Sequence, residues 1–284
     1  MRAAIWLESY ISEYMSEVSI VIPTYNNAEK LERTISLINN KELKIIVIDD
    51  GSNMNNRRIN EEICRKNNIL YQWFANSGPS KARYIGLRFV ETPFVVFLDC
   101  DDYISYDAIS IAIKHLKQND SSYLVFRSTY ISDFKNIKKL ESELGVTKVH
   151  KIKSGFLPAA LAILGMGFSS KWNQSNTVYK CSHLKSVYKC RSLTWAEDIP
   201  LKIMIMLNLA GEYWDCNRAS FIEISYGRGY IYKYSQVIDL VKEIATLQER
   251  SSLKHILLSF ICLIRFSLSY VYKQFCNRLN HDRN

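Results

Sequence analysis

The chain has 284 residues, with 37 Lys and Arg against 28 Asp and Glu, which gives a formal net charge of +9. Hydrophobic residues make up 48% and charged residues 23% of the sequence, which is the balance of a folded domain and excludes a disordered chain. The cysteines form no C-x-x-C pair, which argues against a zinc ribbon or a thioredoxin-like site. Free thiols fit a reducing cytoplasm, and residues 1–17 lack the long apolar run of an export signal.

Short apolar runs alternate with helical patterns in the first half of the chain. The runs are β-branched and bounded by turn residues, which predicts buried strands at 18–22, 44–48, 69–74, 94–98 and 123–131. Apolar residues at helical spacing predict helices around 31–38, 59–63, 80–89 and 108–116, with Ser80 as the N-cap of the third. Residues 135–172 look less regular, and a further helix is expected at 199–209. This alternation predicts an α/β fold with a mainly parallel sheet flanked by helices.

Polar residues follow three of these predicted strands. In an open parallel sheet, ligands bind beyond the carboxyl ends of the strands. The sequences there are Pro-Thr-Tyr-Asn at 23–26, Asp-Asp-Gly-Ser at 49–52 and Asp-Cys-Asp-Asp at 99–102. Five carboxylates are therefore expected to gather at one edge of the sheet. Like charges repel, so a cation or hydrogen-bond donors must compensate them.

Asp99 and Asp101 are candidate metal ligands. They are two residues apart, and extended geometry would place both on one face. Carboxylate oxygens suit Mg²⁺ or Mn²⁺, which are bound by a few carboxylates together with substrate phosphates. The alternative is that Asp-Cys-Asp-Asp is only a polar turn that caps a helix.

Two helix starts carry further candidates. The stretch 76–83 enters a helix, and its backbone N–H groups with Lys81 and Arg83 are suited to phosphates, or else form an ordinary capped turn. Asp198 opens the helix expected at 199–209, where its ionised form is favoured. It is therefore either a general base or a simple helix-capping residue.

Together these motifs resemble the family 2 glycosyltransferases. That family consists of inverting, nucleotide-sugar-dependent enzymes with the GT-A fold. The order and spacing of the motifs agree over about residues 18–103, and Glu197-Asp198 lies where the family has its acidic base motif. One departure is Tyr84, which stands where Asn is usual after Ala-Arg.

The resemblance implies a role for each matching residue. Asp198 would deprotonate the acceptor hydroxyl, and Asp101 would hold Mn²⁺ or Mg²⁺ on the diphosphate of the donor. Tyr25 and Asp50 would contact the base, which is expected to be uracil, and Asp99 would approach the ribose or the sugar. The residues implied for binding the nucleotide-sugar are Pro23, Thr24, Tyr25, Asp50, Lys81, Arg83, Asp99 and Cys100.

The expected organisation has three parts. Residues 1–17 form an N-terminal extension, and 18–235 form the GT-A domain, with a nucleotide-sugar half at about 18–130 and an acceptor half at about 131–235. Residues 236–284 form an amphipathic helical tail with a C-terminal apolar stripe. The stripe comprises Leu253, Ile256, Leu257, Phe260, Ile261, Ile264, Leu268, Val271, Tyr272 and Phe275.

The tail has two interpretations. From residue 250 onward six Lys and Arg stand against one acid, so the stripe over 253–275 is suited to lie in the plane of an anionic membrane. Alternatively it packs on the domain. The expected acceptor is a hydroxyl of a growing cell-surface glycan or a lipid-linked molecule, and the expected location is the cytoplasm or the inner face of the plasma membrane.

Other function classes fit less well. A nucleotidyltransferase usually has a phosphate-binding loop rich in Gly, Arg and Lys after its first strand, where this chain has Pro-Thr-Tyr-Asn. A nucleic-acid-binding protein needs a basic face, whereas the predicted binding edge is acidic, so no nucleic acid is expected as a partner. A nucleotide-sugar-binding protein without catalysis stays open, although the motif aspartates weigh against it.

Overall fold

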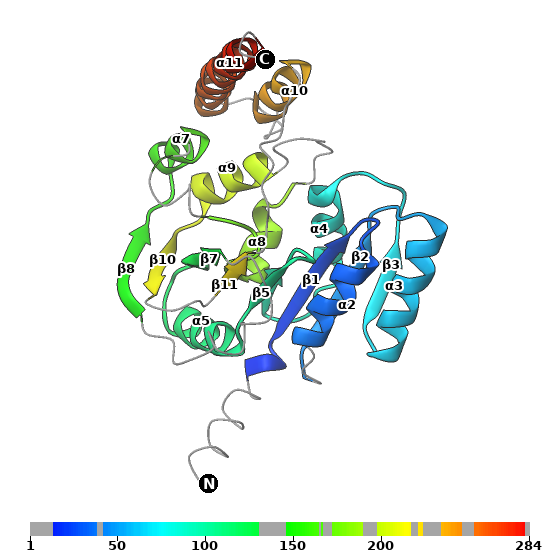
Figure 1. Cartoon of the computed structure of the whole chain (residues 1–284). Coiled ribbons are helices and arrows are strands. Elements are labelled where there is room, and N and C mark those ends of the chain that lie inside the picture. Colours follow the sequence, from blue (N-terminus) through cyan, green and yellow to red (C-terminus); the bar gives the residue numbers. More distant parts are fainter. Residues whose placement is uncertain are drawn as a thin grey trace.

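The computed structural model describes residues 14–38, 42–130, 146–164, 166, 172–189, 198–216, 221–223, 234–245 and 253–281. These residues form a central sheet with helices on both of its faces (Figure 1). The eight strands of this sheet lie in the order β3-β2-β1-β4-β9-β6-β10-β8. Their bounds are β1 Val18–Thr24, β2 Lys44–Asp49, β3 Leu70–Trp73, β4 Phe94–Phe97, β6 Tyr123–Phe126, β8 Val146–Ile152, β9 Thr177–Lys180 and β10 Gly211–Cys216.

The sheet is mainly parallel, as predicted. Strands β3, β2, β1 and β4 run parallel to one another, and β6 runs parallel to β10. Strand β9 lies antiparallel between β4 and β6, and β8 lies antiparallel at the edge beside β10. The carboxyl ends of β1, β2 and β4 therefore meet at one edge of the sheet.

Both faces of the sheet are covered, which explains why the strands read as continuous apolar runs. Along β1, Ile20 and Ile22 enter one buried cluster, while Val21 enters the other. Helices α2 (Ala28–Leu37), α3 (Met54–Lys66) and α5 (Tyr106–Gln118) contribute to the first cluster, and α4 (Pro79–Arg88), α8 (Cys181–Val187) and α9 (Asp198–Asn208) contribute to the second. Alternate residues of a strand thus pack on opposite helical layers.

Two features of the sequence prediction are wrong in detail. The strand expected at 123–131 divides after Phe126, and β7 (Ser128–Tyr130) joins a separate three-stranded sheet with β5 (Asp102–Ile104) and β11 (Phe221–Glu223). An apolar run does not reveal a change of pairing partner. The stretch 135–172, expected to be irregular, contains β8 and α7 (Phe156–Leu164).

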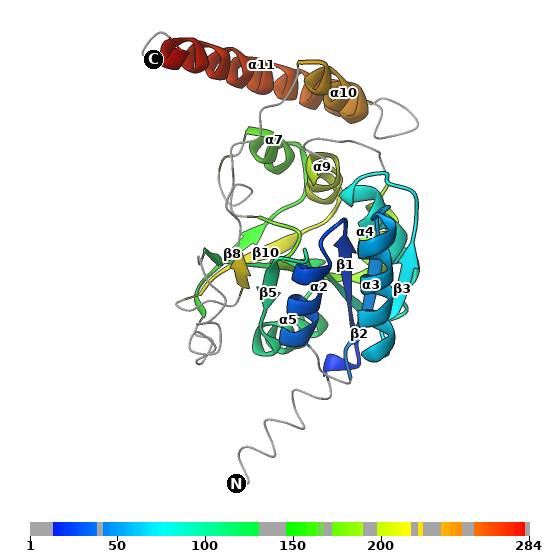
Figure 2. The same ribbon diagram turned by 45° about the vertical axis from the view of Figure 1, so that its right-hand side comes forward.

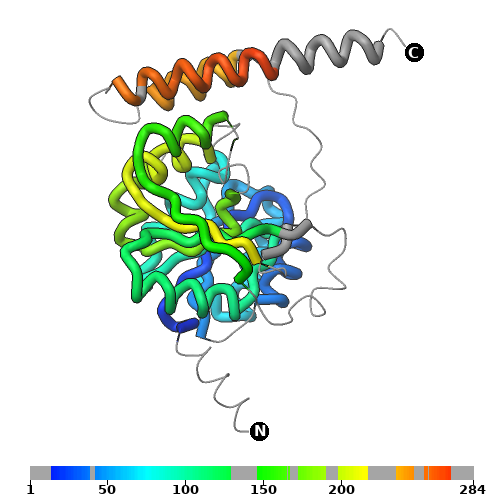
Figure 3. The backbone as a smooth tube through the Cα atoms, turned by 90° about the vertical axis from the view of Figure 1, so that its left-hand side faces the viewer, coloured from blue at the N-terminus to red at the C-terminus, as the bar shows by residue number. Residues whose placement is uncertain are grey.

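The tail forms helices α10 (Tyr234–Ala245) and α11 (Leu253–His281). These helices lie beside each other across the end of the molecule toward which β1 points (Figures 2 and 3), and α11 also packs on α7. Helix α11 buries Leu258, Cys262 and Phe266. In the described part of the chain, no helix has the length and apolar character needed to cross a membrane.

Candidate functional site

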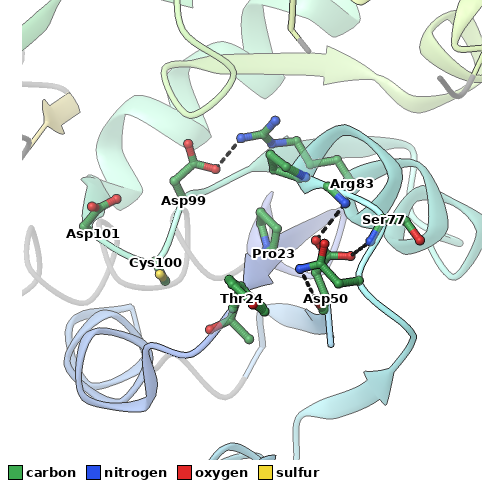
Figure 4. Close-up of a pocket in the computed structure, with 12 residues that line it drawn as sticks. Pro23, Thr24, Asp50, Ser77, Arg83, Asp99, Cys100 and Asp101 are labelled. Carbon is green, nitrogen blue, oxygen red and sulfur yellow. Dashed lines mark hydrogen bonds and ion pairs between the residues drawn. The ribbon is translucent and has the colours of Figure 1, made fainter. Parts of the chain in front are cut away.

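A cavity of about 630 Å³ lies where β1, β2 and β4 end, in the size range of small-molecule sites. Figure 4 shows Pro23 and Thr24 between Asp50 and Arg83 on one side and Asp99 and Asp101 on the other. The lining residues are Pro23, Thr24, Tyr25, Asp50, Asn76, Ser77, Gly78, Pro79, Arg83, Asp99, Cys100 and Asp101. Every predicted donor-site residue except Lys81 therefore lines one cavity, together with the predicted metal ligand.

Side-chain hydrogen bonds join the loops that follow β1 and β2. The backbone N–H of Asn26 donates to the Ser52 hydroxyl at 2.8 Å, and the Asn53 N–H donates to the Asn26 side-chain oxygen at 2.8 Å. Asn26 has φ 51°, a left-handed conformation that Asn tolerates. These bonds fix the backbone beside Thr24 and Tyr25, and Tyr25 stands 53% exposed at the rim of the cavity.

The neighbouring residues Asp49 and Asp50 have different surroundings. Asp49 is fully buried and accepts hydrogen bonds from the Ser52 N–H at 2.8 Å, the Asn60 amide at 2.9 Å and the Tyr71 hydroxyl at 2.8 Å. Its carboxylate therefore holds the β2 loop, α3 and β3 together and does not line the cavity. Strand alternation accounts for this difference, because successive side chains point to opposite faces.

Asp50 does line the cavity. Its two carboxylate oxygens accept the backbone N–H groups of Ser77 and Gly78 at 2.8 and 2.9 Å. Burial raises the pKa of Asp50 and the nearby Asp49 adds to this, although the two backbone bonds oppose it. The N–H groups of Ser77 and Gly78 are thus occupied by Asp50. The phosphate contact expected for the 76–83 stretch would have to come from other residues of that stretch.

Gly51 allows the segment after β3, which begins near Asn76, to approach the loop that follows β2. It has φ 85°, and a Cβ at this position would lie 2.5 Å from the backbone nitrogen of Asn76. Because a side chain is excluded by both conformation and contact, glycine is required here. The Asn76 amide donates to the carbonyl of Asp50 at 2.9 Å and completes the junction.

Arg83 projects from α4 into the cavity. Its guanidinium pairs with the Asp99 carboxylate at 2.6 Å, and its side chain is only 6% exposed (Figure 4). Lys81 does not line the cavity, and its ammonium lies 5.8 Å from the ring centre of Tyr84. Ser80 is not the N-cap of α4, because the helix begins at Pro79 and the cap position is occupied by Gly78.

Tyr84, the departure from the family pattern, packs edge-on against Tyr188, with ring centres 5.5 Å apart. Tyr84 is absent from the cavity lining. Tyr84 therefore packs against the core and takes no part in the cavity wall.

The Asp-Cys-Asp-Asp segment is a turn rather than an extended strand end. The N–H of Asp102 donates to the carbonyl of Asp99 at 3.0 Å, and Asp102 is buried at the start of β5. The geometric reason given for placing Asp99 and Asp101 on one face is therefore wrong. Asp99 pairs with Arg83, whereas Asp101 pairs with Lys30 at 3.0 Å. Of the five carboxylates expected at this edge, three line the cavity.

The cavity fits a divalent cation only if the substrate supplies further ligands. Among the described residues, no group of three or more His, Cys, Asp or Glu is arranged to hold a metal. Asp101 provides hard carboxylate oxygens in the cavity, and Mg²⁺ is commonly bound by one or two carboxylates plus substrate phosphates. The Cys100 thiol is a poor ligand at neutral pH, because burial and the adjacent aspartates raise its pKa to about 12.

Asp198 is the first residue of α9, and Glu197 lies outside the described residues. The Asp198 carboxylate pairs with Lys202, one helical turn onward, at 2.5 Å. Burial alone would raise the pKa of Asp198, but Lys202 and the charge of Arg83 outweigh it and lower the pKa. Asp198 does not line the cavity, yet Arg83 lies near enough to connect it electrostatically with Asp99.

The sequence singled out the stretch 76–83 as a candidate for phosphate contact, and four of its residues, Asn76, Ser77, Gly78 and Pro79, line the cavity. Two cations of the site, Lys30 and Lys202, were not singled out from the sequence. Lys202 was detectable from its i,i+4 spacing to Asp198. Lys30 carried no such signal, since its partner is 71 residues away.

Comparison with known proteins identifies the family of the chain. Residues 19–171, more than half of the chain, match the model of the family described as Glycosyl transferase family 2. A poly(ribitol-phosphate) beta-N-acetylglucosaminyltransferase, TarP of Staphylococcus aureus, is 31% identical over 173 residues, which are 58% of this chain and 53% of TarP. A GalNAc(5)-diNAcBac-PP-undecaprenol beta-1,3-glucosyltransferase of Campylobacter jejuni is 32% identical over 153 residues, 51% of this chain and 48% of that protein. The chain thus spans about half the length of these relatives.

Solved structures show the same fold. Residues 1–349 of S. aureus TarS superpose with a TM-score of 0.59 at 21% identity, covering 89% of this chain and 73% of that one. The same protein in complex with UDP-GlcNAc gives a TM-score of 0.58 at 21% identity, covering 84% and 70%. The GT-A type fold predicted from the sequence is confirmed. On the family match, the chain belongs to glycosyl transferase family 2.

Proposed function

We propose that this protein is an inverting glycosyltransferase that moves a sugar from a UDP-sugar to a hydroxyl of a cell-surface glycan or a lipid-linked acceptor. The observation that carries the proposal is the cavity at the carboxyl edge of the sheet, whose lining includes Tyr25, Asp50, Asp99 and Asp101. Arg83 connects this cavity with Asp198, the proposed base. An open α/β sheet binds ligands at this edge.

The nucleoside end of the donor is assigned to the part of the cavity near Asp50. Its carboxylate is held by two backbone N–H groups, so its remaining lone pairs have fixed directions for an N–H donor of the base. Tyr25 supplies an aromatic surface at the rim, and Pro23 and Thr24 form the floor between the two sides. The TarS structures in complex with UDP-GlcNAc and with UDP support a uridine nucleotide as ligand.

The diphosphate end is assigned to the part near Asp99 and Asp101. Asp101 would hold Mg²⁺ or Mn²⁺ through its carboxylate, and the bound ion would offset the negative charge on the departing diphosphate. Lys30 neutralises Asp101 in the protein alone. Arg83 supplies a second positive charge at this end, and Asp99 orients its guanidinium.

Asp198 acts as the general base in this proposal. Its lowered pKa keeps the carboxylate ionised at neutral pH, so it is able to accept the proton of the acceptor hydroxyl. The hydroxyl oxygen then bonds to the anomeric carbon from the face opposite the diphosphate, and the bond from that carbon to the diphosphate oxygen breaks. Displacement from the opposite face inverts the anomeric centre. The beta linkages in the names of the two relatives support inversion from an α-linked donor.

The acceptor class follows from the relatives. Their names specify a poly(ribitol-phosphate) chain and an undecaprenol-linked glycan, so we assign this protein a glycan or lipid-linked acceptor. A peripheral position on the inner face of the plasma membrane is part of the same proposal, because a lipid-linked acceptor is held at a membrane.

The deciding experiment measures nucleoside diphosphate release from a panel of UDP-sugars and other nucleotide-sugars, with and without Mn²⁺. We expect release of UDP from one sugar. Release of pyrophosphate would indicate a nucleotidyltransferase instead, and donor binding without release or transfer would indicate a binding protein.

Two variants test the assigned roles. Asp198→Asn should lower the transfer rate about 100-fold or more with UDP affinity retained, whereas Asp120→Asn, at an exposed carboxylate, should not change it. Normal transfer by Asp198→Asn would rule out the base. Asp101→Ala should remove the stimulation by Mn²⁺, and undiminished metal-dependent activity would rule out the metal assignment.

A further inference from the structure

Helix α11 is apolar on two opposite faces. One face, with Leu258, Cys262 and Phe266, is buried in the core. The other, here called the outer face, consists of Leu253, Ile256, Leu257, Phe260, Ile264 and Leu268, which are 38–71% exposed. The outer face belongs to the predicted stripe, so six of the seven stripe residues with described side chains do not pack on the domain, whereas Ile261 packs against the core. The side chains of Val271, Tyr272 and Phe275 lie outside the described residues.

The charge of α11 indicates what covers this face. The helix contains Lys254, Arg265, Lys273 and Arg278 and no Asp or Glu. A second copy seated on the outer face would bring two such basic helices together, and like charges oppose that contact. An anionic surface is complementary to both the apolar stripe and the cations.

The position of α11 relates this face to the catalytic edge. Helices α10 and α11 lie beyond the end of the sheet toward which β1 points, and α9, which begins at Asp198, lies between them and the sheet (Figures 1 and 2). A surface that contacts the outer face therefore lies at the same end of the molecule as the proposed base.

We propose that the outer face of α11 lies in the plane of an anionic membrane and that the acceptor reaches the cavity from that membrane. The helix does not span the bilayer, in keeping with the absence of a membrane-crossing helix among the described residues. The membrane contact stands on α11 alone, while the statement about the acceptor rests on the proposed transferase function. A glycan anchored in the bilayer is then the substrate class.

The test uses the full chain and sedimentation with vesicles, without donor or acceptor, so its outcome is separate from that of the transferase assay. Vesicles of phosphatidylcholine with phosphatidylglycerol should bind the protein at least tenfold more strongly than phosphatidylcholine alone, since each Lys or Arg near the surface contributes about fivefold. The double variant Phe260→Gln with Ile264→Gln should weaken this binding about tenfold or more.

A control double variant replaces two other exposed apolar side chains, away from α11. Met54 and Leu70 are 66% and 41% exposed on α3 and β3, and changing both to Gln should leave vesicle binding unchanged. Circular dichroism checks that both double variants fold. Failure of the parent to bind anionic vesicles, or equal loss in the two double variants, would overturn the proposal. So would a shift from dimer to monomer in the α11 variant, because the face would then be a subunit interface.

Discussion

The adjacent carboxylates Asp49 and Asp50 provide a test of how this site is built. Asp49 accepts three buried hydrogen bonds and does not line the cavity, whereas Asp50 lines it. We therefore expect Asp49→Asn to reduce stability while the folded protein still binds UDP. Asp50→Asn should instead reduce UDP affinity.

The size of each effect follows from the contacts. An Asn at 49 keeps one acceptor oxygen and turns an amide N–H₂ toward at least one of the three donors. Losing a hydrogen bond to a charged group and leaving a buried donor unpaired costs about 3 kcal/mol, a large share of the 5–15 kcal/mol typical for a domain. The melting temperature should fall by about 6–12 °C. At position 50, losing a charge-assisted bond to the base should weaken UDP binding about tenfold or more.

Thermal unfolding and calorimetric titration with UDP measure the two effects on the same preparations. Tyr71→Phe is a graded control, because it removes one of the three donors to Asp49 and leaves the other two, at a cost of about 1 kcal/mol. The division of roles between the two residues is wrong if Asp49→Asn has the melting temperature of the parent protein. It is also wrong if folded Asp49→Asn binds UDP as weakly as Asp50→Asn does.

Three further predictions concern single contacts. Gly51→Ala should lower the free energy of unfolding, measured in urea, by about 1–3 kcal/mol, because Ala would be strained at φ 85°. A variant as stable as the parent protein would contradict the requirement for glycine at this loop contact. Lys202→Met removes the cation that lowers the pKa of Asp198, so the acid limb of the pH profile of kcat/KM should move to higher pH, whereas Lys81→Met should leave it in place. The pKa of Cys100 is raised to about 12, so iodoacetamide at pH 8 should alkylate it much more slowly than an exposed thiol, as mass spectrometry of the labelled peptide would show.

The donor half of the fold was predictable because its signals are local. The first, second and fourth strands are continuously apolar and each ends in a distinctive polar loop, so their position and direction follow from the sequence alone. The division after Phe126 was not predictable, because strand pairing depends on residues far along the chain. β7 pairs with β11, whose residues begin at Phe221.

The site shows the same limit. Sequence patterns identified Asp50, Asp99 and Asp101, but not which groups compensate their charges. Lys30 reaches Asp101 only because α2 packs beside the turn that follows β4, and the bonds from Ser77 and Gly78 to Asp50 exist only because β2 and α4 meet in space. Such tertiary contacts join residues at no fixed spacing in the sequence, so no sequence pattern predicts them.

These compensating groups change the physical role of a divalent cation. Like charges gathered at one edge were expected to require a cation or hydrogen-bond donors, and each functional carboxylate has a partner from the protein. The pairs are Asp50 with two backbone N–H groups, Asp99 with Arg83, Asp101 with Lys30 and Asp198 with Lys202. The fold therefore does not depend on a metal to hold these carboxylates together. A cation at Asp101 would act with the donor, because the diphosphate adds negative charge at this end of the cavity, and the affinity for the cation should rise when the nucleotide is bound.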